Sequence, residues 1–379
     1  MTVTLFARSL PCAFVLLGGA ALAAGAPDAG RPAVVSAMRA NFGALMTLQP
    51  YLASQARFAD PGNAEEIAHQ LVILRQTRHA FRAPPRTEEP GVAAMMALFD
   101  GYLSTAQDRF AKGAHEAARH QLQTATGFCL GCHTRVVVAK DYADLQGQVS
   151  SLELTPLERA DLLAATRQFR EALALYQELL AGPARGELAQ RLLADAAKGA
   201  LRITVVVHDD AQETVAWLGE LTKRPELGVA LRRDVEAWLK EAEAWRAEPA
   251  PAKDEPVAAT VARARALLNA GGPLPGEVTL LRAGALLHRA LAREPTGKSR
   301  GEALYLLGLS ASGTPDTFRY ELDQLYFEAC IRENPHSELA RRCHERLESN
   351  VTLAFTGSAG TSVPPELSRK LAALKAVAK

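Results

Sequence analysis

The spacing of apolar residues over the first third of the chain constrains the fold more than any other feature of the sequence. From about Pro32 to Leu145, four segments carry apolar residues at intervals of three, four or seven positions, and stretches rich in Pro, Gly and polar residues separate them. Such intervals place apolar side chains along one face of an α-helix. On the first segment that face carries Val35, Met38, Phe42, Leu45 and Leu52. Four such segments with short connections predict an up-and-down four-helix bundle over residues 24–146.

The rest of the chain is predicted to be helical as well, so we expect an all-α protein. Ala and Leu dominate the composition, β-branched runs are few, and 48% of the residues are hydrophobic. The segment Ala160–Pro183 resembles one tetratricopeptide repeat (TPR), and residues 301–348 repeat its pattern of two helices joined at a turn. We therefore predict TPR-like helical repeats over residues 150–247, a linker rich in Pro and Ala over residues 248–257, and a C-terminal TPR-like helical region over residues 258–379.

The first 23 residues have the composition of an export signal. Arg8 lies in a short leading region, an apolar stretch runs from about Leu10 to Leu22, and Ala21 and Ala23 form an A-x-A cleavage site. The apolar stretch is too short to span a bilayer comfortably. We therefore expect export to the periplasm, cleavage near Ala23, and no transmembrane segment in the mature chain; an uncleaved anchor is the alternative.

The charge of the chain bears on its partners. A formal net charge of +1 argues against nucleic-acid binding, which requires a strongly basic surface. Residues 1–23 contain one Arg and no acidic residue, so the mature chain has a formal net charge of 0. Stacked helical repeats form a concave surface. A protein is therefore the expected macromolecular partner.

The fourth helical segment ends in the sequence CLGCH, from Cys129 to His133. C-x-x-C-H is the attachment signature of c-type haem. Two thiols one helical turn apart reach the two vinyl groups of one porphyrin, and the following imidazole reaches the iron from the same side. The apolar face of this segment runs through Cys129 and Cys132, so both thiols are expected to face the core. We therefore predict one covalently attached haem c per chain.

Three other interpretations of the cysteine pair are weaker. A zinc site needs four ligands, and no second C-x-x-C and no H-x₃-H lies near the pair. A thioredoxin-like C-x-x-C requires a βαβ context, and a disulfide within one helical turn would constrain little. The sequence has no Gly-rich phosphate loop, no G-x-S-x-G, no H-E-x-x-H and no second C-x-x-C-H. We therefore do not expect an enzyme.

A helical bundle of this length with C-x-x-C-H near its end resembles the cytochrome c′ family. The segment MRANFGALMTL (Met38–Leu48) is also similar to the first helix of that family. The resemblance covers about residues 30–145. It implies a monohaem c-type cytochrome in which Cys129 and Cys132 form the thioethers, His133 is the proximal iron ligand, and the first helix covers the distal face.

The resemblance also bears on the distal side of the haem. That position is apolar in the gas-binding, five-coordinate members and methionine in the six-coordinate, electron-transfer members. Alignment on NFGAL places Val35 there, with Arg31 one turn earlier, where the family often carries an arginine. Met38 lies one turn from Val35, and a small change of register would bring its thioether to the iron. Two alternatives therefore remain: Val35 covers the distal face of the haem, or Met38 ligates the iron.

Beyond His133 the sequence departs from the family pattern. Relatives often carry an aromatic residue and an arginine at the positions that Val136 and Val137 occupy here. Arg135 or Lys140 would then pair with a haem propionate, unless both are solvated charges at a helix end.

Three functions follow as hypotheses. In the first, the haem carries one electron to or from a protein partner that the repeats bind. In the second, an open iron under Val35 binds nitric oxide or carbon monoxide. In the third, the haem is structural, and the repeats act as a protein-binding scaffold.

Several other residues have less specific interpretations. Four histidines lie off the predicted core stripes and are expected at the surface: His69, His79, His115 and His120. Met95 and Met96 are expected to fill the core. Cys330 and Cys343 flank the ENPHS turn, where a disulfide and a pair of buried thiols are both open.

Overall fold

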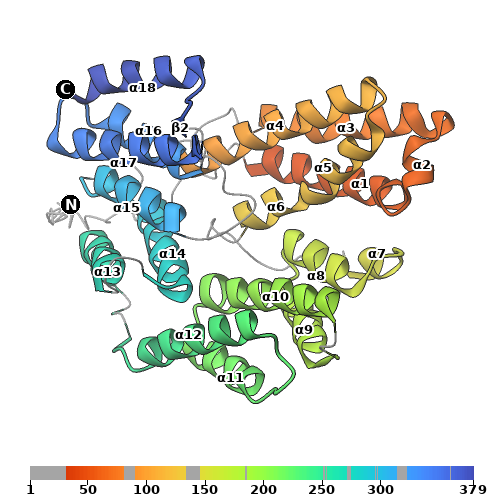
Figure 1. Ribbon diagram of the computed structural model, residues 1–379, viewed down its shortest axis with the longest axis horizontal. Helices are drawn as coiled ribbons and strands as arrows, with labels where there is room; N and C mark the ends of the chain where they lie inside the picture. Colours follow the sequence, from red (N-terminus) through yellow and green to blue (C-terminus); the bar gives the residue numbers. More distant parts are fainter. Residues whose placement is uncertain are drawn as a thin grey trace, which may run out of the picture.

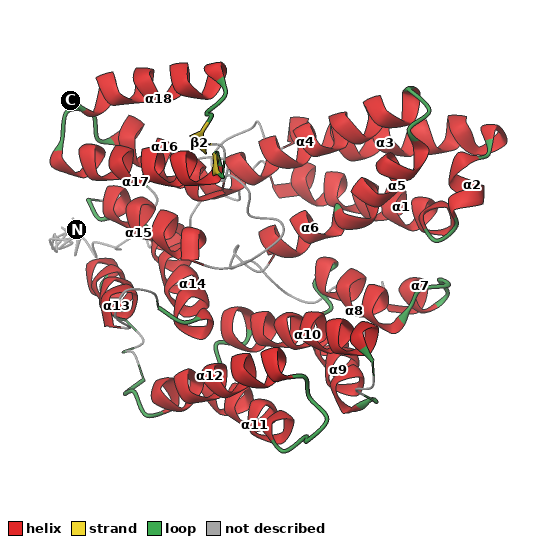
Figure 2. Ribbon diagram, in the orientation of Figure 1, coloured by secondary structure: helices red, strands yellow, loops and turns green. Residues whose placement is uncertain are grey.

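The computed structural model of this chain describes residues 31–80, 90–133, 146–183, 186–250, 252, 254–270, 275–294, 296, 298–313, 322–358 and 360–379. Regular structure in these residues is helical, except for one hairpin formed by β1 (Thr356–Gly357) and β2 (Gly360–Thr361) (Figure 2). The predicted all-α class is therefore confirmed. Among the described helices, none combines the length and apolar character needed to cross a bilayer.

Some predictions fall outside the described residues. They concern the export signal in residues 1–23 and four residues that follow the C-x-x-C-H motif: Arg135, Val136, Val137 and Lys140.

The N-terminal helices are α1 (Arg31–Leu52), α2 (Gln55–Ala59), the 3-10 helix η1 (Pro61–Asn63), α3 (Ala64–Ala80), α4 (Pro90–Ala111), α5 (His115–Thr124) and α6 (Thr126–His133). Helix α1 packs on α3, α3 packs on α4, and α4 packs on both α5 and α6. The apolar stripes expected from the sequence contribute to the core between them, since Leu52, Leu71, Leu103 and Leu122 are almost fully buried.

The fourth helical segment was expected to be continuous, and the structure corrects this by dividing it into α5 and α6 at Ala125. The hydroxyl of Thr124 donates to the carbonyl of Gln121 over 2.9 Å and is hydrogen-bonded to the hydroxyl of Tyr102 on α4. A threonine hydroxyl that bonds back to its own turn bends a helix. The amide of Ala125 donates to the carbonyl of Leu122, three residues back, over 3.1 Å. The bend sets the direction of α6.

The next helices are α7 (Gln146–Ser150), α8 (Pro156–Ala165), α9 (Phe169–Ala181), α10 (Glu187–Arg202), the π-helical turn η4 (Ile203–Val207), α11 (Ala211–Thr222) and α12 (Val229–Arg246). After the predicted linker come α13 (Val257–Ala270), α14 (Glu277–Arg293), α15 (Arg300–Gly313), α16 (Leu322–Glu333), α17 (Glu338–Ala354) and α18 (Pro365–Ala378).

Local sequence signals begin several of these helices. Thr155 and Glu158 form a reciprocal capping box at the start of α8, where each side chain bonds to a backbone amide of the other residue. Asp210 caps α11 by accepting from the amide of Glu213 over 2.9 Å, and Ser337 caps α17 in the same way. These caps satisfy amides that the helix itself leaves without acceptors.

The helices from α8 to α18 form a curved array (Figure 1). Most consecutive helices in it pack on each other, but α10 and α11 both pack on η4, and α12 packs on α14. The array also packs back on the N-terminal helices, where α8 contacts α6 and α16 contacts α4. The N-terminal helices therefore lie between the beginning and the later part of the array (Figure 1). One cluster of buried apolar side chains runs through the N-terminal helices and α13–α18, and a second runs through α7–α12 and η4 and extends onto α14.

A disulfide joins Cys330 on α16 to Cys343 on α17. Both cysteines are completely buried. The sequence left a disulfide and two buried thiols as alternatives at this hairpin, and the structure contains the disulfide. A cross-link of this kind persists in an oxidising compartment.

Candidate functional site

A cavity of about 550 Å³ lies between α1, α4, α6 and the turn that follows α8. Its size falls in the range of about 300–1,000 Å³ that is usual for small-molecule and cofactor sites. These elements come from distant parts of the sequence, and α6 lies between the N-terminal helices and α8 (Figure 1). The described lining residues are Val35, Met38, Arg39, Asn41, Phe42, Leu45, Met95, Met96, Phe99, Phe128, Cys129, Cys132, His133, Ala165, Thr166 and Arg167.

Helix α6 places the three motif residues in the wall of this cavity. Phe128 anchors the helix on α4, because its ring lies 5.7 Å from that of Phe99 and 5.1 Å from that of Tyr102, measured between centroids. Cys129 and Cys132 follow at the spacing of one helical turn, both are half-buried, and neither forms a disulfide. The two thiols therefore lie on the same wall, as the periodicity of the sequence predicted.

The chemical state of Cys129 differs from that of a reactive cysteine. Burial, with a smaller contribution from the neighbouring Cys132, raises the pKa of the Cys129 thiol to about 12. Reactive and redox-active cysteines have lowered pKa values, because nearby positive charge stabilises their thiolate. The Cys129 thiol is therefore protonated at neutral pH.

His133 closes the C-terminal end of α6 and is held in one tautomer. Its Nδ1 lies 2.6 Å from the backbone oxygen of Ala165, the last residue of α8. A carbonyl oxygen can only accept a hydrogen bond, so Nδ1 carries the proton and donates. Burial is the main cause that lowers the pKa of His133 to about 4; the bond to Ala165 opposes the shift, and the charge of Arg167 adds to it. At neutral pH the imidazole is therefore uncharged, and Nε2 has its lone pair.

The side of the cavity formed by α1 and α4 carries the predicted distal residues. Val35 and Met38 on α1 both line it, and so do Met95 and Met96 on α4. The two methionines of α4 are 3% and 8% exposed, so their predicted burial is confirmed, but their position in the cavity wall was not foreseen. Arg31 lies in the first turn of α1, where the structure describes the backbone alone.

The histidines that were expected at the surface stay away from the cavity where they are described. His69 and His120 are exposed, and His115 stacks on Phe110 with ring centroids 5.0 Å apart. The side chain of His79 lies outside the described residues.

The described part of the cavity wall carries positive charge. Among its lining residues are the cations Arg39 and Arg167 and no Asp or Glu. The remainder of the wall is mostly aliphatic, aromatic or sulfur-containing. The arrangement suits a ligand with a large apolar body and acidic groups, which guanidinium groups bind through charge-assisted hydrogen bonds.

Sequence reasoning missed the contribution of the turn after α8. Ala165, Thr166 and Arg167 line the cavity, although they are more than thirty positions from the motif and belong to the predicted repeats. The spacing of apolar residues within one helix does not indicate which distant loop will pack against that helix and close a cavity. A positive φ at a residue other than Gly, here 68° at Arg167, is visible only in the structure.

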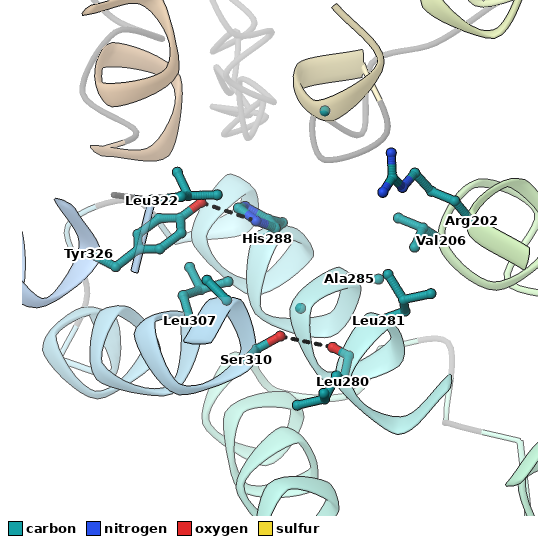
Figure 3. A pocket seen from close by; sticks show the side chains of 13 residues that line it. Arg202, Val206, Leu280, Leu281, Ala285, His288, Leu307, Ser310, Leu322 and Tyr326 are labelled. Atoms are coloured by element: carbon teal, nitrogen blue, oxygen red, sulfur yellow. Dashed lines mark hydrogen bonds between the residues drawn. The ribbon is translucent and has the colours of Figure 1, made fainter. Parts of the chain in front are cut away.

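A second cavity, of about 40 Å³, lies on another side of α6 and is lined by residues of α10 and α14–α16. Figure 3 shows its polar groups: the hydroxyl of Tyr326 is 3.3 Å from Nε2 of His288, and Ser310 donates to the carbonyl of Leu280 over 2.8 Å. Its volume suits one or two water molecules and excludes a cofactor.

Comparisons with known proteins leave the site to be interpreted from its own chemistry. No family model, no curated protein and no solved structure matches the chain. Within the described residues, no group of three or more His, Cys, Asp or Glu side chains is arranged to hold a metal ion.

Proposed function

We propose that this protein is an exported monohaem c-type cytochrome, in which a haem bound covalently in the cavity carries one electron to or from a protein partner. The observation that carries the proposal is a coincidence of position. The sequence pattern alone singles out five residues that line one cavity in the structure: Val35, Met38, Cys129, Cys132 and His133.

The cavity fits the proposed group in three respects. Its volume of about 550 Å³ lies within the range of cofactor sites. Its wall is mainly apolar, as the porphyrin ring requires. Two guanidinium groups, Arg39 and Arg167, match the two carboxylates that a haem carries.

The residues of the chain have distinct parts in this proposal. When bound, the haem supplies reversible one-electron oxidation and reduction of its iron. Cys129 and Cys132 would form the thioether bonds, and Nε2 of His133 would ligate the iron. The carbonyl of Ala165 orients the imidazole through Nδ1, as second-shell acceptors commonly do for metal-bound histidines.

The proposal extends to the architecture of the chain. We infer that α1, α3, α4 and the α5–α6 pair form a four-helix bundle similar to that of the cytochrome c′ family. The later helices form TPR-like repeats that bind the partner. The disulfide between Cys330 and Cys343 supports an oxidising compartment, and the composition of residues 1–23 supports export to the periplasm.

The sixth iron ligand decides between electron transfer and gas binding. The cavity wall holds three thioethers, on Met38, Met95 and Met96, which favour a six-coordinate iron and an electron-transfer role. Val35 lines the same wall and would instead cover an open coordination position.

The test is the visible absorption spectrum of the mature protein in its ferric and ferrous forms, with and without carbon monoxide. A low-spin spectrum that is indifferent to carbon monoxide supports the proposed electron carrier. Replacing the ligating methionine, among M38L, M95L and M96L, should then produce a high-spin form. A high-spin ferrous spectrum that shifts with carbon monoxide in the unmodified protein contradicts the electron-transfer role and favours gas binding under Val35.

A further inference from the structure

The turn that closes the cavity has a defined backbone geometry. Helix α8 ends at Ala165, and two amides beyond it bond back into its last turn: Gln168 donates to Leu163 over 2.8 Å and Arg167 donates to Ala164 over 3.1 Å. This pair of bonds defines a Schellman motif. In this motif the carbonyls of Leu163 and Ala164 each accept a hydrogen bond from a backbone amide beyond the helix. The carbonyl of Ala165 points beyond the turn and accepts from His133 instead.

Arg167 occupies the position of this motif that usually belongs to glycine. Its φ is 68°, in the left-handed region where a side chain is unfavourable. Residues held in such strained conformations cluster at ligand-binding sites, where the surrounding structure enforces them. Two side-chain hydrogen bonds hold the turn here: the hydroxyl of Thr166 donates to the carbonyl of Leu162 over 2.8 Å, and the side-chain amide of Gln168 donates to the hydroxyl of Thr166 over 3.2 Å.

The rigid turn brings the guanidinium of Arg167 to the cavity. Arg167 is half-buried and lines the wall, and its charge acts on His133. A charge-assisted hydrogen bond is stronger in such a partly desolvated position than at the open surface. Arg39, the other cation of the cavity, comes from α1 and is exposed.

We propose that Arg167 binds a carboxylate of the cofactor, a haem propionate, so that the repeat region supplies part of the haem site. This inference rests on the proposed function. It assigns a ligand-binding role to a residue outside the part of the chain that resembles the cytochrome c′ family. The repeat region would thereby take part in the haem site at two points: Arg167 would bind the propionate, and the carbonyl of Ala165 bonds to His133.

The experiment compares the reduction potential of the haem in the mature full-length protein and in three variants. R167G removes the cation, and because glycine suits a positive φ the turn is expected to fold. R167K keeps a positive charge. R170A is the matched control, since it removes a cation three residues away whose side chain is 86% exposed and pairs with Glu171.

A cation beside a propionate disfavours the ferric state, which has the higher positive charge. R167G should therefore shift the ferric–ferrous equilibrium about tenfold toward the ferric form, which corresponds to about 59 mV for a one-electron couple. R170A should leave the potential nearly unchanged, and R167K, which keeps the positive charge, should keep the potential close to that of the unmodified protein. The midpoint of urea unfolding of R167G should equal or exceed that of the unmodified protein, since glycine relieves the backbone.

A second measurement, the crystal structure of the haem-loaded protein, should place a guanidinium nitrogen of Arg167 within about 3.2 Å of a propionate oxygen. Retained haem with an equal potential in R167G and R170A, or a guanidinium directed away from both propionates, overturns the role of Arg167 and leaves the proposed function intact. A mature protein without covalent haem refutes the proposed function itself, and the assignment of Arg167 with it.

Discussion

The carboxyl group of Asp161 gives a prediction about pH and stability whose magnitude follows from the structure. Asp161 on α8 accepts a hydrogen bond of 2.5 Å from the hydroxyl of Tyr176 on α9. Burial raises the pKa of Asp161 from 3.8 to about 6, and Asp195 adds to the rise, whereas the bond from Tyr176 and the charge of Arg202 oppose it. Because the folded state then binds the proton more tightly than the unfolded state, the stability of the fold falls as the pH rises from about 4 to about 6, and the loss is complete above about pH 6.

The variant D161N removes this ionisation but keeps an oxygen that accepts from Tyr176. One pKa unit corresponds to about 1.4 kcal/mol, so a rise of about two units gives D161N a stability advantage of up to about 3 kcal/mol at pH 7.5. The advantage should shrink as the pH falls through 6 and vanish near pH 4, where the carboxyl is protonated in both states.

Urea unfolding of the two proteins, followed by circular dichroism between pH 4 and 7.5, measures this difference. Other titrating groups are the same in both proteins, so most of their contribution cancels. A stability difference that is independent of pH, or a D161N protein that is less stable at pH 7.5, would refute the reasoning.

Two further predictions concern packing and cross-linking. A Cβ on Gly199 would lie 2.5 Å from Cζ of the buried ring of Tyr176, so G199A should lower the free energy of unfolding by about 1–3 kcal/mol. In the control G219A, where nothing lies within 4 Å, the substitution should be neutral or stabilising by up to about 1 kcal/mol, and urea unfolding compares the two. Replacing Cys330 and Cys343 together by Ser should lower stability by about 3 kcal/mol, because their disulfide closes a loop with a sequence separation of 13. Thermal unfolding with and without reductant measures this, and a reductant that leaves the melting temperature of the unmodified protein unchanged while its thiols become free would contradict it.

The parts of the site that lie close together in the sequence were predictable. Cys129, Cys132 and His133 fall within one and a half helical turns, so their common position on α6 follows from the geometry of a helix. The burial of Ala118 and Leu122 followed from the same periodicity. Intervals of three and four report which face is buried, but they do not report whether the helix is continuous. At the bend, Thr124 is hydrogen-bonded to Tyr102 on another helix, and a contact of this kind leaves no trace in the spacing of apolar residues.

The parts of the site that depend on tertiary packing were not predictable. Ala165 reaches His133 because α8 packs on α6, and the Schellman turn leaves its carbonyl directed outward. Arg167 is unremarkable in the sequence, since an arginine at the end of a helix is usually a solvated charge. Met95 and Met96 are buried, as expected of core residues. Their place in the cavity wall becomes apparent only from the structure.

The central claim is that a haem is attached through Cys129 and Cys132, and the intact mass of the protein tests it most directly. The protein is expressed with its own N-terminus in a host that exports and matures c-type cytochromes, and it is purified from the periplasm. The account predicts a chain that begins near residue 24 and is heavier than its polypeptide by one haem, and it predicts that the added mass survives denaturation. The double variant C129S/C132S should lack that mass, whereas C330S/C343S should keep it. A mature chain with the mass of the polypeptide alone would contradict the account.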